Sequence, residues 1–162
     1  MTTEFTLRRA DPGDAATIAE MRVRSSAERN AGVAPERSDA FRAACEAALE
    51  AELREGDTRI WLAFEGERAV GTATLMLMRT LPRIRSRSGI VADARDGRVR
   101  NVYVEPAYRG RGIAQALMRE VLNEARRERV DRLTLGASDM GRPLYEKMGF
   151  VAKRDEMIYE GS

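Results

Sequence analysis

The chain has 162 residues, of which 43% are hydrophobic and 33% are charged; this composition is typical of one folded domain, which we place over residues 1–162. It contains no histidine and one cysteine, which excludes Cys/His zinc sites, histidine-based catalytic triads and internal disulfides. The chain has no long apolar run and no signal-peptide pattern, so we expect a cytoplasmic protein that does not bind membranes. Its net charge of only +2 does not indicate nucleic-acid binding, which we do not expect.

The first predicted elements are a short strand over residues 4–9 and two helices. Asp11 and Pro12 are typical of a helix start, because aspartate caps the first turn and proline fits the first helical position. Ser38 can cap the second helix, in which apolar residues recur every three or four positions. Cys45 falls on this apolar stripe, so we interpret it as a buried thiol rather than a catalytic one.

A hairpin and an arginine-rich segment follow. The apolar runs 59–64 and 69–78 are joined by the sequence Glu-Gly-Glu-Arg, which predicts a β-hairpin. Residues 81–98 contain five arginines and show no regular pattern. We expect this segment to be either a solvated loop or a rim that orients an anionic substrate or cofactor.

The C-terminal half alternates between strand and helix patterns. A strand, a long amphipathic helix, a strand and a short helix are expected over residues 99–104, 113–129, 132–135 and 143–148. Gly149 can end the short helix, and residues 151–153 and 156–159 could close the sheet as a final hairpin. This order of elements predicts an α/β fold with a mixed sheet and helices on both of its faces.

The connection between the predicted strand and the long helix has the properties of an anion-binding loop. Gly110 and Gly112 lack side chains, so their amides can approach a phosphate closely. The helix start at Gly112 adds unpaired N–H groups and the positive end of the helix dipole. Arg109 and Arg111 add positive charge. The loop is not a Walker motif, because no lysine follows the glycines, and it is not a dinucleotide-binding motif, because the third glycine is missing. A glycine-rich turn that binds no ligand is the alternative interpretation.

Two motifs in this half carry a family resemblance. Arg109, Gly112 and Ala114 match the signature [RQ]xxGx[GA], and the segment ASDMGRPLYEKMGF, over residues 137–150, matches a second motif. The chain therefore resembles the GNAT superfamily of acyl-coenzyme A-dependent N-acyltransferases, over nearly its whole length. The resemblance implies the GNAT fold, acetyl-CoA as co-substrate, a small-molecule or peptide amine as acceptor and no metal. Relatives are commonly dimers, so a homodimer is one expectation.

The resemblance also implies roles for individual residues. In the family the central strand separates from its neighbour, and its free backbone groups pair with pantetheine; here these belong to Val102, Tyr103 and Val104. The pyrophosphate would rest on the amides of the loop and helix start, which are those of Arg109, Gly110, Arg111, Gly112, Ile113 and Ala114. Ser138 lies where relatives contact the pantetheine or adenosine end. Tyr145 matches the tyrosine that protonates the leaving thiolate in many relatives, and a purely packing role is the alternative.

No general base is assigned from the sequence. The central strand has no internal carboxylate; Glu105 and Asp96 flank it, and Asn101 could orient a water. We interpret the chain as an N-acetyltransferase in which a primary amine of an unidentified acceptor attacks acetyl-CoA in a ternary complex. The alternatives are a catalytically silent acyl-CoA sensor of the same fold, and a phosphate- or nucleic-acid-binding module that uses the basic surface of residues 83–111.

Overall fold

A five-stranded sheet lies at the centre of the computed structural model, which describes residues 4–30, 35–87, 89–153 and 155–160. Its strands are, in spatial order, β1 (Thr6–Arg9), β2 (Thr58–Glu65), β3 (Arg68–Arg79), β6 (Arg95–Val104) and β7 (Arg132–Leu135). Neighbouring strands are antiparallel except β6 and β7, which run parallel. The sheet is therefore mixed, as predicted.

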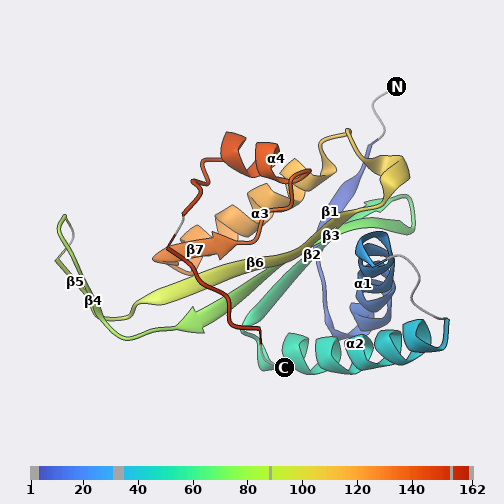
Figure 1. Cartoon of the computed structure of the whole chain (residues 1–162), viewed down its shortest axis with the longest axis horizontal. Helices are drawn as coiled ribbons and strands as arrows, with labels where there is room; N and C mark the ends of the chain where they lie inside the picture. Colours follow the sequence, from blue (N-terminus) through green and yellow to red (C-terminus); the bar gives the residue numbers. More distant parts are fainter. Residues whose placement is uncertain (1–3, 31–34, 88, 154, 161–162) are drawn as a thin grey trace.

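Helices cover both faces of this sheet (Figure 1). On one face lie α1 (Ala15–Arg29) and α2 (Pro35–Glu55), and on the other lie α3 (Ile113–Arg127) and α4 (Arg142–Lys147). Two short 3₁₀ helices, η1 (Pro12–Asp14) and η2 (Pro106–Tyr108), precede α1 and α3. No helix in the described part of the chain is both long and apolar enough to span a bilayer.

Each face of the sheet has its own apolar core, because successive residues of a strand point to opposite sides. On β2, Ile60 and Leu62 pack with α1 and α2, whereas Trp61 and Ala63 belong to the cluster that includes Leu117 of α3. Leu117 is fully buried. At roughly 25 cal/mol per Å² of apolar surface removed from water, these two cores are the main source of stabilisation. They hold β6, which lies between the helix layers, in a fixed position.

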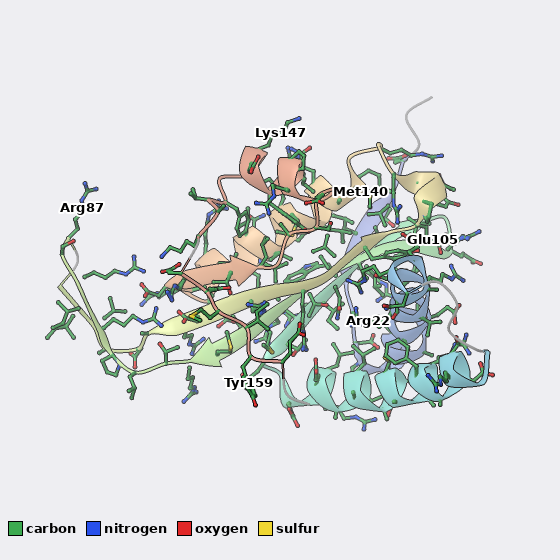
Figure 2. The ribbon with its side chains drawn as sticks, viewed as in Figure 1. Arg22, Arg87, Glu105, Met140, Lys147 and Tyr159 are labelled. Carbon is green, nitrogen blue, oxygen red and sulfur yellow. The ribbon has the colours of Figure 1, made fainter. Side chains whose placement is uncertain are left out.

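The arginine-rich segment forms regular structure, and the prediction of an irregular loop over residues 81–98 was wrong. The strands β4 (Arg83–Arg85) and β5 (Gly89–Val91) make a two-stranded arm that projects from the sheet, with Arg87 at its end (Figures 1 and 2). Arg83 anchors the base of the arm through two contacts of 2.7 and 2.8 Å with the Asp96 carboxylate. Because this anchor joins residues distant in sequence, local periodicity did not reveal it.

The predicted final hairpin is also absent: residues 151–153 and 155–160 contain no strand. Met157, Ile158 and Tyr159 are almost fully exposed. The helix stop before this segment is as predicted, since Gly149 has a φ of 94° and its amide bonds the Glu146 carbonyl.

Candidate active site

The central strand β6 separates from β7 in its second half. Parallel pairing ends at Val99, opposite Leu135, whereas β6 continues to Val104 and stays paired with β3. The amide of Glu105 bonds the Val70 carbonyl of β3. Because backbone groups alternate along a strand, those of Tyr103 face β3, and those of Val102 and Val104 face the open side. The strands therefore separate as expected, but the backbone groups of Tyr103, which were expected to be free, face β3.

A β-bulge lies where the strands begin to separate. Thr72 of β3 pairs with Tyr103 of β6, and Thr74 pairs with Arg100. A step of two residues on β3 therefore corresponds to a step of three residues on β6. Asn101 is in this bulge and has a φ of 53°, a left-handed conformation that asparagine tolerates better than most residues. Sequence reasoning missed the bulge; an asparagine inside an otherwise β-forming run was its one signal. The bulge turns the end of β6 away from β7.

The glycine loop that follows β6 leaves its amides accessible. Gly110 and Gly112 have φ angles of 76° and 80°, and a Cβ atom built on either would meet nothing within 4 Å. Gly112 is the N-cap of α3 and, as a glycine, has no side chain to cap the first turn of the helix. The amides of Ile113 and Ala114 are in this first turn, where N–H groups lack helical partners. The loop therefore has the conformation and open space that an anion-binding loop needs, and phosphate binding by these amides stays a prediction.

The two arginines of the loop make ion pairs that fix its position. Arg109 donates to Glu28 at 2.7 Å and, through Nε, to the Val104 carbonyl at 2.9 Å. Arg111 contacts Glu65 at 3.2 Å. Their charges are therefore largely matched by carboxylates. From the sequence, we expected Arg109 and Arg111 to add positive charge around a phosphate. Because each guanidinium already pairs with a carboxylate, the amides of the loop are better placed to donate hydrogen bonds to a phosphate.

Tyr145 of α4 is buried against the same part of the structure. Its ring belongs to the apolar cluster that contains Val104 and Ile113, and it contacts Phe150 edge-on at 6.0 Å between ring centroids. A Cβ at Gly141 would lie 3.1 Å from the ring, so a glycine there allows the close packing. Burial raises the pKa of the Tyr145 phenol, because the ionised form loses its hydration. The phenol is thus held protonated at neutral pH.

Ser138 lies in the turn that leads into α4. Its hydroxyl accepts a hydrogen bond from the Gly141 amide at 3.2 Å, and its carbonyl accepts from the Arg142 amide at 2.9 Å. The side chain is exposed. These hydrogen bonds show that Ser138 stabilises the turn. Its predicted contact with a coenzyme stays a prediction.

Neither of the two carboxylates considered as a base is free; Glu105 follows β6, whereas Asp96 lies inside this strand, which begins earlier than predicted. Glu105 is buried at the end of the strand, beside α1, where it pairs with Arg24 and, at 2.7 Å, with Arg68 (Figure 2). Asp96 is held by Arg83. Two charge-assisted bonds on each carboxylate occupy its oxygens. Both groups therefore stabilise the structure.

A cavity of about 320 Å³ lies between the sheet and the helices α1 and α2. Its lining comes from four elements: Ile18, Met21, Arg22, Ser25, Cys45, Ala48, Leu49, Glu52, Thr72, Arg100, Asn101 and Tyr103. Cys45 is half-buried here rather than in a closed core, and burial raises the pKa of its thiol. The Tyr103 hydroxyl donates to Glu28 at 3.0 Å, and burial together with this carboxylate raises the Tyr103 pKa to about 12. Sequence reasoning missed this cavity.

Comparisons with known proteins agree with this geometry. Residues 25–162 match the family model of the acetyltransferase (GNAT) domain. The chain belongs to the GNAT acetyltransferase family. Two solved GNAT-type structures superpose on it closely. A predicted acetyltransferase from Clostridium acetobutylicum, solved with acetyl-CoA, has a TM-score of 0.80 and 25% identity, and the match covers 97% of this chain and 96% of that one. A GCN5-related N-acetyltransferase from Ralstonia eutropha JMP134 has a TM-score of 0.78 and 26% identity, with 97% and 99% covered.

A curated relative is the glucosamine 6-phosphate N-acetyltransferase of Trypanosoma brucei brucei. It is 33% identical over 90 residues, which are 56% of this chain. The match likewise spans 56% of that relative's length. The GNAT assignment therefore establishes the fold and supports an acyltransferase, whereas the acceptor has to be inferred from the site.

Proposed function

We propose that this GNAT domain transfers the acetyl group of acetyl-CoA to a primary amine by direct attack in a ternary complex. The observation that carries the proposal is the continuity of two features: the open edge of β6 leads directly into the glycine loop at the start of α3. In this proposal pantetheine pairs with the open side of β6 at Val102 and Val104, and the pyrophosphate binds the amides of residues 109–114.

In the transfer step the amine nitrogen attacks the thioester carbonyl carbon, the C–S bond breaks and the coenzyme leaves as a thiolate. Tyr145 supplies the proton that the thiolate takes up, and its apolar surroundings keep the phenol protonated beforehand. The attacking nitrogen loses its extra proton to water, which Asn101 can orient from the bulge. Holding the two substrates together accounts for much of the rate.

The experiment is release of free thiol from acetyl-CoA in the presence of an amine panel. The panel contains glucosamine 6-phosphate, amino acids, polyamines and peptides, and a reaction without amine corrects for Cys45 and for hydrolysis. We expect amine-dependent release together with acetyl-CoA binding. Binding without release for any amine favours a silent acyl-CoA sensor. Failure to bind acetyl-CoA contradicts the proposal and favours a phosphate- or nucleic-acid-binding module.

A further inference from the structure

The cavity between the sheet and the helices α1 and α2 adjoins the point where the acyl group would lie. Asn101, in the bulge, lines this cavity and lies two residues beyond Val99, the last residue paired with β7. A coenzyme with its phosphates on residues 110–114 and its pantetheine along residues 104–102 ends at this bulge. On the proposed function, the cavity therefore receives the acceptor.

The charges that line the cavity are mainly positive. Arg22 of α1, which lies above α2 in the view of Figure 2, and Arg100 of β6 both contribute to the lining. The one acidic lining residue is Glu52, and it already pairs with Arg100 and accepts a hydrogen bond from Thr58. Within the described residues, no carboxylate lies within ion-pair distance of Arg22. One cation in the cavity is thus unmatched.

The cavity also holds buried polar groups without hydrogen-bond partners. Thr72 is 2% exposed, and its Oγ1 has no partner among the described residues. The Nε of Arg100 is buried and likewise lacks one. Burial lowers the pKa of Arg22, and the nearby cations Arg29 and Arg100 lower it further. Uncompensated positive charge in a partly buried site is costly, and an oxyanion beside Arg22 would relieve it.

We propose that the acceptor of this enzyme is an amine that also carries an oxyanion group, a phosphate or a carboxylate, which Arg22 binds in this cavity. The planar guanidinium of Arg22 matches two oxygens of such a group. The amine of the same molecule then faces Asn101 and the end of the cleft. Glu52 does not select a cationic group, because Arg100 already compensates its charge.

The kinetic test uses matched acceptors: phosphoethanolamine against ethanolamine, and β-alanine against its amide. We expect at least one anionic member to exceed its neutral counterpart in kcat/KM by about 10- to 100-fold, the range expected for a charged hydrogen-bonded pair. Arg22→Met should remove most of this preference by raising KM. Arg126→Met, which removes an exposed charge from α3, is the control and should leave the preference intact. Equal use of both members of each pair, or a preference that survives Arg22→Met, overturns the proposal.

A second readout does not depend on turnover. Cys45 is the one cysteine of the chain and lines the same cavity, so its alkylation can be followed by mass spectrometry of the intact protein. Phosphoethanolamine or β-alanine should slow alkylation of the parent protein and of Arg126→Met, but not of Arg22→Met; ethanolamine should not slow it. If no amine is acetylated, the proposed function fails, and this measurement alone decides whether the cavity binds oxyanions. The proposal is overturned if neither phosphoethanolamine nor β-alanine at about 50 mM slows alkylation of Cys45, or if either slows it equally in Arg22→Met.

Discussion

At the scale of single residues, Tyr145 shows how packing can prepare a side chain for acid catalysis. The ring is enclosed by the cluster that contains Val104 and Ile113, and burial raises the pKa of its hydroxyl. A raised pKa means that the proton is lost only above the ordinary tyrosine value near 10, so the phenol stays protonated up to about that pH.

Replacement of Tyr145 by phenylalanine should therefore lower kcat by about 10²- to 10⁴-fold, the usual contribution of a positioned acid. Acetyl-CoA affinity and the melting temperature should stay close to those of the parent, because the ring and its contact with Phe150 remain. Tyr159→Phe, at an exposed position, is the control. Turnover of Tyr145→Phe within twofold of the parent, where chemistry limits the rate, would leave Tyr145 a packing residue.

The same assignment predicts the pH profile. The rate should rise with pH as the acceptor amine loses its proton, and the fall caused by ionisation of Tyr145 should begin only above about pH 10, since its folded-state pKa is raised. Measurement of kcat against pH for an accepted amine tests this expectation. A decline of kcat well below pH 9, with the protein still folded, contradicts it.

At the scale of elements, the connection from β6 to α3 combines a strand end, a 3₁₀ turn and a helix start. Its backbone needs two left-handed residues, Gly110 and Gly112, and its position is held by ion pairs of Arg109 and Arg111 to distant carboxylates. The glycines thus suit the proposed anion site in two ways: they permit the conformation, and they leave space in front of the amides.

Replacement of Gly112 by valine should abolish the thermal stabilisation that acetyl-CoA confers, which is about 2.7 kcal/mol at 100 times Kd. The added Cβ strains a residue with a φ of 80° and fills the space in front of the amides. Gly56→Val is the matched control, because Gly56 has a φ of 85° and equally open surroundings but lies between α2 and β2. Both variants should lose similar intrinsic stability. A normal acetyl-CoA shift in Gly112→Val removes the basis for the phosphate site.

At the scale of the whole molecule, two apolar cores share one sheet. Ile60 packs toward α1 and α2, and the neighbouring Trp61 packs toward α3. The proposed site needs both layers, because Tyr145 and the glycine loop lie with α3 and α4, whereas Arg22 comes from α1. A homodimer remains a prediction that light scattering can test.

Because the sheet joins both cores, the chain should unfold as one cooperative domain. Trp61, the one tryptophan, is buried in the core on the α3 side, so its fluorescence reports that layer. Far-UV circular dichroism reports all helices, including α1 and α2. The two unfolding curves should coincide and shift together when acetyl-CoA is added. Separate transitions would show that the two layers unfold independently.

Local patterns were enough for much of the fold and for the geometry of the glycine loop between β6 and α3. The strand before the loop, the glycines and the helix start are neighbours in sequence, so their spacing predicts their geometry directly. The α3 helix has a strong apolar face, and Gly149 ends α4 as expected. The family motifs rest on the same contiguous residues. These features follow from steric and hydrogen-bonding rules that act within a few residues.

Other features depended on contacts between distant parts of the chain. Arg83 orders the arm by binding Asp96, and Arg22 meets Thr72 and Arg100 only after α1 has packed on the sheet. The final hairpin, predicted from composition alone, is not formed. A sequence pattern records the preference of each residue, whereas burial, ion pairing and cavity shape depend on which segments the folded sheet brings together. The sequence alone therefore determined the fold class and the glycine loop proposed to bind phosphate, and the tertiary structure decided the cavity proposed for the acceptor.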